Sequence, residues 1–508
     1  MRAILPVCGL VFFAILIWGC QRDTPFNPTI EVQDFPDSVN QIIQANCATR
    51  GCHAGSDLGS DLDLTSWTAM HQGSNFGTVM IPGWPDWSHL FMHSNTYEEL
   101  GITALPAMPF NADEYLSRTE VLTLRNWINA GGLSKKGDSY WASRRAETNG
   151  KAFILCAGSD LMAVIDLQTE LVMDFVEVGG DPLFPEGPHY IEISPDNQFL
   201  YLTFITSGDS LTRGSAIVEK YGTDNYALVG RCQVDSDPAL IVLSQSGNRM
   251  VISHYNSLPA MAKLTLINTE TMEILHEAVG DGTFLASPHG MASTFDFRTL
   301  YVGAGRGNYY TKVSIVEDKF DQEDEKIRID PSVRRIGENP DYEPYHCYLL
   351  EDRKLFFVTC SLTNDVRVFN TENDSLLAVI PVGETPRLMD YDPVSGRMFI
   401  ACGNEENFAE QGSLKGCVTV LNVASLTVEK NIFRIGQRPH GIRVDPERRR
   451  LYVSTENNGG KDPPHHFVPG RGTLQPGKFH VIDLNTLEVI QELDTDLAFR
   501  PNQIAITK

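Results

Sequence analysis

Residues 439–455 read PHGIRVDPERRRLYVST, which is a proline, an apolar stretch with β alternation, a turn and a second apolar stretch. Similar phrases begin at seven prolines, namely Pro188, Pro238, Pro288, Pro344, Pro386, Pro439 and Pro501. Successive copies start 50, 50, 56, 42, 53 and 62 residues apart, and further strand pairs lie between them. A repeat of roughly 40–60 residues with about four strands per unit is typical of a β-propeller.

Seven copies predict seven blades over residues 151–508. The last copy contributes one strand at 503–507, whereas three strands without a partner (152–157, 161–166 and 170–178) precede the first copy. These four strands would complete one blade and close the ring, which removes the exposed edges of an open sheet. The phrases SPDNQFLYL, LYVST, VIDLQTE and VIDLNTLEV resemble those of YVTN-type seven-bladed propellers. That resemblance implies the all-β fold and says little about activity, since propellers host many functions.

The composition limits the class of protein. The 508 residues carry 41 lysines and arginines against 65 aspartates and glutamates, a formal net charge of -24. Such an acidic chain repels phosphate backbones, so no nucleic-acid partner is expected. Hydrophobic residues make up 42% and charged residues 21%, which excludes global disorder and a polytopic membrane protein.

The N-terminus predicts export. An apolar run from Ala3 to Trp18 suits a signal peptide and is shorter than the ~20 residues of a spanning helix, although an uncleaved anchor helix is the alternative. Residues 17–20, Ile-Trp-Gly-Cys, resemble a bacterial lipobox. The resemblance implies a signal peptide at residues 1–19 and lipidation of Cys20, and Gln21 implies retention at the outer membrane. We therefore expect a lipoprotein on the periplasmic side of a bacterial membrane, held by its lipid anchor.

Three segments separate the leader from the propeller. Residues 20–35 read as a polar tether, and residues 133–150 as a charged linker. Residues 36–132 show helical periodicity near both ends, so we expect a small all-α domain there. The apolar positions that carry this periodicity are Val39, Ile42, Ile43, Val121, Leu122, Leu124, Trp127 and Ile128.

The strongest chemical signal in the chain is Cys47-Ala48-Thr49-Arg50-Gly51-Cys52-His53. A c-type haem requires two thiols for its thioether bonds and an adjacent histidine as proximal iron ligand. Four residues separate the cysteines where two are common, and the longer loop still brings both sulfurs to one porphyrin edge. The alternatives are a Cys47–Cys52 disulfide and half of a zinc site, for which this domain offers no further cysteine.

The distal ligand is expected from residues 105–109, Leu-Pro-Ala-Met-Pro, where prolines stiffen a loop around Met108. A thioether opposite the histidine is usual in electron-transfer cytochromes c and raises the potential. The order of motifs resembles cytochrome c domains, which implies haem c on Cys47, Cys52, His53 and Met108. The matching pieces are Asn46–His53, Ile81-Pro82-Gly83, Ser88-His89-Leu90, Met108-Pro109 and Trp127-Ile128. The rivals for the distal position are Met80, Met92, His71, His89 and His93; a His/His site would lower the potential.

A second candidate site follows from the repeat itself. The residues just after each repeated proline should converge at one mouth of the central channel. They are His189, Ala239, His289, Tyr345 or His346, Arg387, His440 and Asn502. The histidines, His189, His289, His346 and His440, suit a second metal or haem, while Arg387 suits a small anionic substrate. The alternative is that Pro-His-Gly is a turn signature whose ring nitrogens bond neighbouring blades.

Cysteines in the propeller are better explained by structure than by metal binding. In an exported protein, Cys347–Cys360 and Cys402–Cys417 are candidate disulfides within two hairpins, and Cys156 and Cys232 are candidate buried thiols.

These features lead to a functional hypothesis. We expect a membrane-anchored periplasmic c-type cytochrome that exchanges electrons with a redox partner protein or with a second centre in the propeller. The enzymatic version resembles the cytochrome c–propeller nitrite reductases and the histidine-lined nitrous oxide reductase. The former have eight blades, and the latter needs about seven histidines, so catalysis stays open. The alternative is a propeller scaffold for protein or ligand binding with an accessory haem domain.

Overall fold

The structure is a computed structural model of the whole chain. It describes residues 31–56, 58–180, 186–205, 216–235, 237–256, 262–279, 285–332, 342–403, 416–433, 435–456, 476–490 and 495–508. The expected signal peptide and the lipidation site Cys20 lie outside these residues. Within the described ranges, no helix has the length and apolar character needed to cross a membrane.

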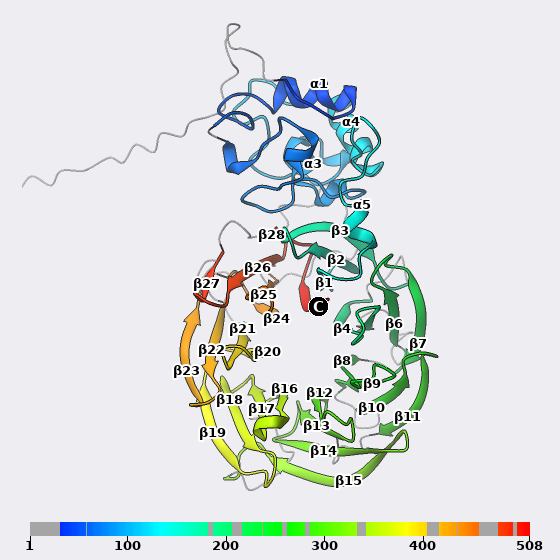
Figure 1. Cartoon of the computed structure of the whole chain (residues 1–508), viewed down its shortest axis with the longest axis vertical. Coiled ribbons are helices and arrows are strands. Elements are labelled where there is room, and N and C mark those ends of the chain that lie inside the picture. Colours follow the sequence, from blue (N-terminus) through cyan, green and yellow to red (C-terminus); the bar gives the residue numbers. More distant parts are fainter. Residues whose placement is uncertain are drawn as a thin grey trace, which may run out of the picture.

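The described part of the chain is mostly β and forms seven sheets that surround a central channel as the blades of a propeller (Figure 1). The strands of each blade are given from the innermost outward. The first two blades are β4 (Pro188–Ile193), β5 (Phe199–Phe204), β6 (Ala216–Gly222) and β7 (Leu228–Val234), and then β8 (Pro238–Leu243), β9 (Arg249–His254), β10 (Lys263–Asn268) and β11 (Glu273–Val279). The next two are β12 (Pro288–Ser293), β13 (Thr299–Ala304), β14 (Tyr309–Val316) and β15 (Lys319–Arg328), and then β16 (Pro344–Leu350), β17 (Leu355–Cys360), β18 (Asp365–Asn370) and β19 (Leu376–Pro381). The fifth is β20 (Pro386–Asp392), β21 (Arg397–Cys402), β22 (Cys417–Asn422) and β23 (Thr427–Ile432), and the sixth is β24 (Pro439–Asp445), β25 (Arg450–Thr455) and β26 (Lys478–Asp483) with β27 (Glu488–Val489) and β28 (Thr495–Asp496).

The seventh blade closes the ring as the sequence predicts. It combines β29 (Pro501–Ile506) from the end of the chain with β1 (Lys151–Cys156), β2 (Leu161–Asp166) and β3 (Leu171–Glu177). β29 pairs antiparallel with β1, with Ile504 opposite Ile154 and Ala505 opposite Phe153. Strands more than 300 residues apart thus share one sheet, and neither chain end leaves an open edge.

The repeated proline starts every innermost strand. Each residue before it has a positive φ, between 50° and 59°. Its carbonyl accepts a hydrogen bond from the residue that follows the second strand of the blade, as in Tyr255 N to Asp237 O at 2.8 Å and Ala157 N to Arg500 O at 2.9 Å. Because proline has no N–H, it opens the strand without an unmet donor. The repeat therefore encodes a fixed turn at one mouth of the channel.

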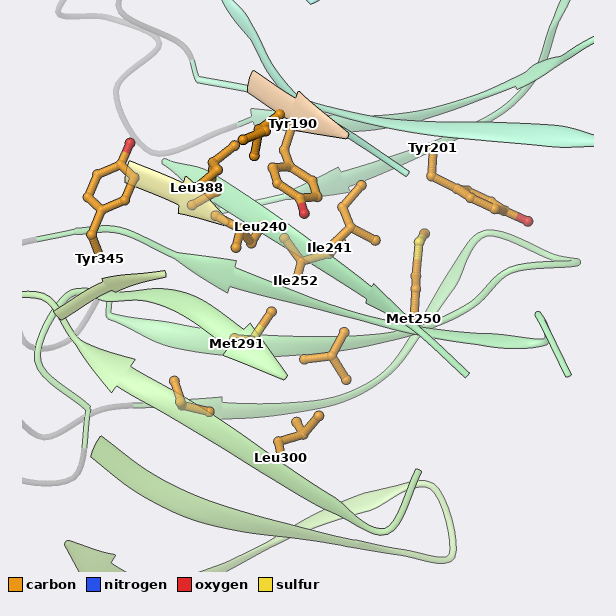
Figure 2. Close-up of a cluster of buried hydrophobic side chains, with 14 of the residues drawn as sticks. Tyr190, Tyr201, Leu240, Ile241, Met250, Ile252, Met291, Leu300, Tyr345 and Leu388 are labelled. Carbon is orange, nitrogen blue, oxygen red and sulfur yellow. The ribbon is translucent and has the colours of Figure 1, made fainter. Parts of the chain in front are cut away.

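The core lies between the blades. Six second strands, from β5 to β25, share one burial pattern, a half-buried first residue followed by five buried ones. Figure 2 shows part of the largest cluster, where Tyr190, Ile241, Met250 and Met291 come from neighbouring blades. The outermost strands β19 and β23 alternate between exposed and more buried residues, because one of their faces meets water.

Residues N-terminal to the propeller form short helices. They are α1 (Asp37–Asn46), α2 (Trp67–Met70), α3 (His89–Ser94), α4 (Arg118–Asn129) and α5 (Ala142–Ala146), with single 3-10 turns at Gly59–Asp61, Pro85–Trp87 and Glu98–Leu100. Helix α4 begins at Arg118, two residues before Glu120, because Ser117 before the helix and Glu120 in its first turn form a capping box. Buried residues of α1 and α4, such as Ile43 and Leu124, share one small core.

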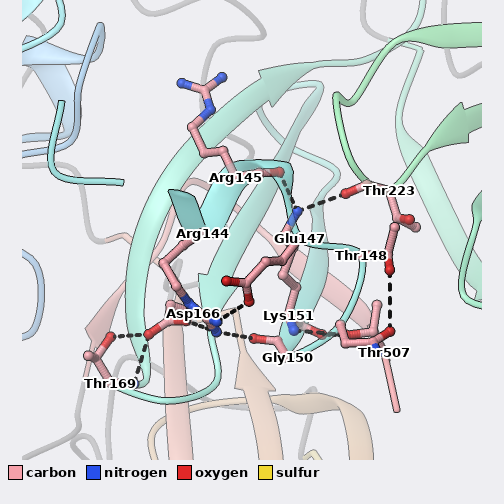
Figure 3. Close-up of polar contacts among 11 residues, drawn as sticks. Arg144, Arg145, Glu147, Thr148, Gly150, Lys151, Asp166, Thr169, Thr223 and Thr507 are labelled. Atoms are coloured by element: carbon pink, nitrogen blue, oxygen red, sulfur yellow. Dashed lines mark hydrogen bonds and ion pairs between the residues drawn. The ribbon is translucent and has the colours of Figure 1, made fainter. Parts of the chain in front are cut away.

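This helical region packs on the rim of the propeller, beside β3 and β28 (Figure 1). Trp87 lies edge-on to Phe499 at 5.0 Å between ring centroids, and Thr78 Oγ1 donates to Val172 O at 3.1 Å. The charged segment 133–150 is fixed in the same contact: Arg144 Nε donates to Asp166 Oδ1 at 2.7 Å, and the Lys151 ammonium donates to two carbonyls (Figure 3).

Candidate functional site

One cavity in the helical region brings the expected haem ligands together. It holds about 270 Å³ and has a mainly apolar lining. Cys47, Cys52, His53 and Met108 all line it. The other lining residues are Asn46, Ser60, Leu62, Leu64, Ser74, Phe76, Val79, His89, Leu90, His93, Ser94, Pro106, Pro109 and Phe110. Residues that lie 55 positions apart in the sequence, from His53 to Met108, thus share one small volume.

The Cys47–His53 loop follows directly from helix α1. Cys47 caps that helix, its N–H donating to Ile43 O at 2.9 Å, and Cys52 N–H donates to Thr49 O at 3.1 Å. Gly51 has a φ of 77°, which glycine adopts without strain and which turns the chain back toward the cavity. Both cysteines are buried. Cys47 is a free thiol whose pKa is raised to about 12 by burial, whereas Cys52 is disulfide-bonded, so the alternative Cys47–Cys52 disulfide does not form and a thioether at Cys52 requires its disulfide to be reduced first.

His53 sits on the cavity wall as a neutral imidazole. Burial lowers its pKa below the usual value, and the backbone of Gly59 and Leu62 opposes part of that shift. The loop that contains Gly59 is held close, because Leu64 N–H donates to His53 O at 2.9 Å. A neutral imidazole with one nitrogen facing backbone groups is the form in which histidine binds a metal.

The Met108 loop is fastened to helix α3. Met108 N–H donates to His93 O at 2.7 Å, Ala104 N–H donates to Met92 O at 2.9 Å, and the His93 ring shares a hydrogen with Pro106 O through Nδ1 at 2.8 Å. These bonds hold the segment around Met108 against the cavity.

The rival distal ligands divide into two groups. His89 and His93 line the cavity, with ring centroids 5.6 Å apart, and His89 Nε2 lies 3.2 Å from Asp496 Oδ2 of the propeller. Among the residues described as lining this cavity, Met80, Met92 and His71 do not occur. His71 stacks on Tyr140 at 4.3 Å, and burial lowers its pKa to about 3, as expected for a packing residue.

A covalently attached haem fits this donor set. Two cysteine sulfurs and an imidazole lie on one mainly apolar cavity, with a thioether on a separate loop. Such a set matches the ligands that haem c requires, and the described lining residues include no carboxylate for a hard cation.

The residues after the repeated prolines converge at one mouth of the channel. The His189 ring lies 5.9 Å from His289 and 6.4 Å from His440 between centroids. Tyr345 occupies the ring position of its blade: its hydroxyl is 3.1 Å from His440 Nε2, and the Arg387 guanidinium lies over its ring at 4.7 Å. Burial, with Arg500 and Arg387 nearby, lowers the pKa of His189 to about 4, so the imidazole is neutral.

His346 does not join this ring. It lies one residue after Tyr345, lines a different cavity at the other end of the channel, and receives a weak hydrogen bond from Met389 N–H at Nδ1 (3.4 Å). Within the described ranges, no group of three or more His, Cys, Asp or Glu side chains is arranged to hold a metal ion. His289 Nδ1 lies 2.8 Å from Tyr345 O of the next blade. This is the bond between blades expected if Pro-His-Gly is a turn signature and not a metal-binding motif.

The propeller cysteines are free thiols in the structure. Cys402 and Cys417 stand directly opposite each other on β21 and β22. Cys347 and Cys360 are offset, since Cys360 faces Pro344 and Cys347 faces Val358. The first pair therefore keeps the register that a disulfide would need.

Sequence reasoning missed one set of channel residues. Glu192, Tyr348, Asp390 and Arg443 each stand four residues after a repeated proline and line the second cavity. The available signal was this shared repeat position, which aligning the seven copies would have displayed.

Comparisons with known proteins agree with the fold. No protein-family model and no curated protein sequence matches this chain. The crystal structure of a functionally unknown protein from Desulfotomaculum acetoxidans DSM 771 matches 71% of this chain and 99% of that chain, with a TM-score of 0.50 and 11% identity. The dihydro-heme d1 dehydrogenase NirN matches 92% of this chain and 98% of its own, with a TM-score of 0.44 and 12% identity. At such identities the first match shows a shared fold alone. The second, with its lower TM-score, supports no conclusion about this chain.

Proposed function

We propose that this chain is an exported, lipid-anchored c-type cytochrome in which a small haem domain is joined to a seven-bladed propeller. The observation that supports it is the convergence of Cys47, Cys52, His53 and Met108 on one apolar cavity. Haem iron, when bound, supplies one-electron transfer.

In this proposal each residue has a defined task. Cys47 and Cys52 would hold the porphyrin through thioether bonds, and His53 and Met108 would bind the iron. The apolar lining would keep water from the iron, and the bonds from His93 and Pro106 keep the Met108 loop in place. The partner is a periplasmic redox protein, and Cys20 anchors the chain to the outer membrane.

The test is covalent haem content. Full-length protein is matured in a periplasm that carries a cytochrome c assembly system, and its denaturing gel is stained for haem. The Cys47→Ser/Cys52→Ser variant should lose the stained band, while Cys232→Ser, which alters a propeller thiol, should keep it. A band that survives the double substitution refutes the haem assignment.

The anchor has a separate test. Cys20→Ser should move the protein from the membrane fraction to the soluble periplasmic fraction without changing the haem stain. Unchanged membrane association would contradict lipidation at Cys20.

A second candidate role, a propeller that binds a ligand or protein, is favoured by the cavity of about 880 Å³ in its channel. At the opposite mouth, Arg387 beside neutral His189 and His440 suits a small anion, and we extend the proposal to an anionic substrate there. The extension is tested by calorimetric titration of nitrite, and of nitrite in competition with fluoride, into the wild-type protein and into Arg387→Gln. The variant should give the smaller heat of binding, and equal heats in both proteins would refute the extension.

A further inference from the structure

The channel contains a second cavity, which neither the haem ligands nor the histidine ring uses. It holds about 880 Å³ and is lined by all seven innermost strands. Its lining includes the turns between first and second strands, such as residues 194–197 and 244–245, so it opens on the face opposite the histidine ring. We call it the channel cavity.

One side of the channel cavity is polar. Four residues after the repeated proline, the chain places Glu192 on β4, Tyr348 on β16, Asp390 on β20 and Arg443 on β24. Strands β16, β20, β24, β29 and β4 are consecutive neighbours around the channel, and Gln503 on β29 fills the gap between Arg443 and Glu192. These five residues form a continuous polar wall.

The other side is apolar. At the same repeat position, β8 carries Val242 and β12 carries Ala292, and Ile241 and Met291 stand next to them. Figure 2 shows Ile241 and Met291 among the side chains of the main core cluster. The channel cavity is therefore amphipathic, with an apolar wall that faces a charged one.

Within the polar wall, two groups are already fixed. Asp390 accepts from Val444 N–H at 2.8 Å and from Tyr391 N–H at 2.9 Å. Arg443 Nε donates to Ile504 O at 3.0 Å, and its Nη2 lies 3.6 Å from Glu192 Oε2, beyond hydrogen-bond distance. Two carboxyl groups thus flank one guanidinium; burial raises the pKa of both Glu192 and Asp390, and Arg443 opposes part of each shift.

Gln503 gives the decisive observation. Its side chain is only 4% exposed, its amide nitrogen donates weakly to Tyr190 O–H at 3.5 Å, and its Oε1 has no hydrogen-bond partner among the described residues. A buried acceptor without a donor costs free energy, so an N–H donor is favoured at Gln503. Arg443 Nη2, a buried donor of the same wall, also lacks a hydrogen-bond partner among the described residues. The wider lining agrees: six acidic side chains face three basic ones, Arg443, Arg448 and Lys508.

We propose that the channel cavity binds a small organic cation, a primary ammonium that carries an apolar group. The ammonium donates to Gln503 Oε1 and to the Glu192 carboxylate, and the apolar group rests on Val242 and Ala292. An ammonium supplies three donors and a second positive charge, which pairs with the carboxyl group that Arg443 does not balance once that group is ionised. This site is independent of the haem proposal and stands or falls separately.

The test uses calorimetric titration of the full chain in 0.1 M salt, which screens unspecific attraction at the surface. The probes are cyclohexylammonium, neutral cyclohexanol and anionic cyclohexanecarboxylate, which share one apolar ring. Saturable 1:1 binding of cyclohexylammonium alone is expected. Equal binding of cyclohexanol, or no saturable binding of the ammonium, overturns the proposal.

Variants separate the site from general acidity. Glu192→Gln should weaken cyclohexylammonium binding about tenfold or more, because a charged hydrogen-bond partner is lost. The matched control Glu447→Gln removes one exposed carboxylate from the rim of the same cavity and should change the affinity less than about twofold. Equal weakening by both substitutions would show unspecific attraction and refute the site.

A variant with the polar wall intact keeps the test valid if Glu192→Gln misfolds. Ala292→Lys places an ammonium of the chain itself opposite the polar wall, so it should abolish binding of cyclohexylammonium. Undiminished binding to a folded Ala292→Lys protein contradicts this placement of the ligand.

Discussion

At the residue scale, the contacts of two histidines bear on the choice of distal ligand. His89 and His93 line the same cavity as Met108, so the lining alone does not separate the three. His89 is held toward Asp496 of the propeller, and His93 is engaged by the carbonyl of Pro106. Each contact engages one ring nitrogen and leaves the other available to a metal, so neither contact excludes its histidine. The preference for Met108 therefore rests on its motif, Leu-Pro-Ala-Met-Pro at residues 105–109.

This preference gives a spectroscopic prediction. In haem-loaded protein, Met108→Ala should abolish the sulfur-to-iron charge-transfer absorption of the oxidised form, because no other thioether lines the described cavity. Met92→Ala is the control: Met92 lies on α3, outside the lining, and should leave the band in place. A band that persists in Met108→Ala would assign the sixth position to another residue.

The sequence predicts single residues unevenly. It selected Cys47, Cys52 and His53 from one local motif and Met108 from a second motif, and all four line one cavity in the structure. It left Tyr345 and His346 open, because the register at the bulge after Pro344 decides which side chain enters the ring. Glu192 and Arg443 escaped notice for another reason: four of the seven repeats carry a single polar residue at this position, and such isolated residues make no local pattern.

At the scale of elements, a buried hydroxyl joins successive blades. Thr203, Ser253, Thr359 and Ser454 occupy the same place on four second strands. Each accepts the N–H two residues after the proline of its own blade and donates to a ring-residue carbonyl of the next blade. In this way each hydroxyl bridges the bulge of the innermost strand in its own blade. It also fixes the backbone of the residue that the next blade contributes to the histidine ring.

Removing one hydroxyl should therefore destabilise the propeller. Ser253 accepts from Leu240 N–H at 3.2 Å and donates to His289 O at 2.8 Å, and it is fully buried. Ser253→Ala should cost about 1–3 kcal/mol, since two buried backbone groups lose their partner. The expected result is a melting temperature lower by a few degrees.

Ser253→Thr is the matched substitution, because two other blades use threonine at this place, and it should retain most of the stability. If Ser253→Ala and Ser253→Thr melt at the same temperature, the hydroxyl bridge is not a stabilising feature.

The elements themselves were predictable where the repeat is explicit. Every innermost strand begins at its predicted proline, because proline both lacks the N–H and fixes the chain direction at the turn. The segment 133–150 was expected as a polar linker, yet its polar side chains are used in the contact with the propeller, as the Arg144–Asp166 bond shows. Charge composition alone does not distinguish a solvated segment from a docked one.

At the scale of the whole molecule, closure depends on eight C-terminal residues. Removing residues 501–508 would expose the edge of β1 and the buried side chains that pack on Ile504 and Ala505. We expect the shortened protein to aggregate, because an unpaired edge strand recruits other strands. Light scattering measures this, and a synthetic peptide of residues 497–508 should reduce it. A shortened protein that stays monomeric with an unchanged melting temperature would contradict the closure argument.

The contact between the helical region and the propeller contains a titratable group that reports on it. Asp174 on β3 accepts from Trp84 Nε1 at 3.3 Å and lies 2.7 Å from Arg145 Nη2. Burial raises its pKa to about 6, while Arg145 and Trp84 oppose part of that shift. The folded state thus holds this proton more tightly than the unfolded state, whose carboxyl titrates near its ordinary pKa of 3.8.

The direction of the pH effect follows from this difference. Asp174 contributes its full share to the free energy of unfolding below the unfolded-state pKa of 3.8, and this contribution is lost as the pH rises through about 6. Between these two pH values only the folded protein still binds the proton. Asp174→Asn keeps the acceptor for Trp84 without the charge, so its melting temperature relative to wild type should rise between pH 4 and 6 and level off above pH 7. The whole change corresponds to at most about 3 kcal/mol. Asp113→Asn, which removes an exposed carboxyl of the same region, is the control for the loss of one negative charge away from this contact. A flat profile for Asp174→Asn would mean that water reaches this contact, and that the helical region is held less closely to β3 than the Trp84 and Arg145 bonds imply.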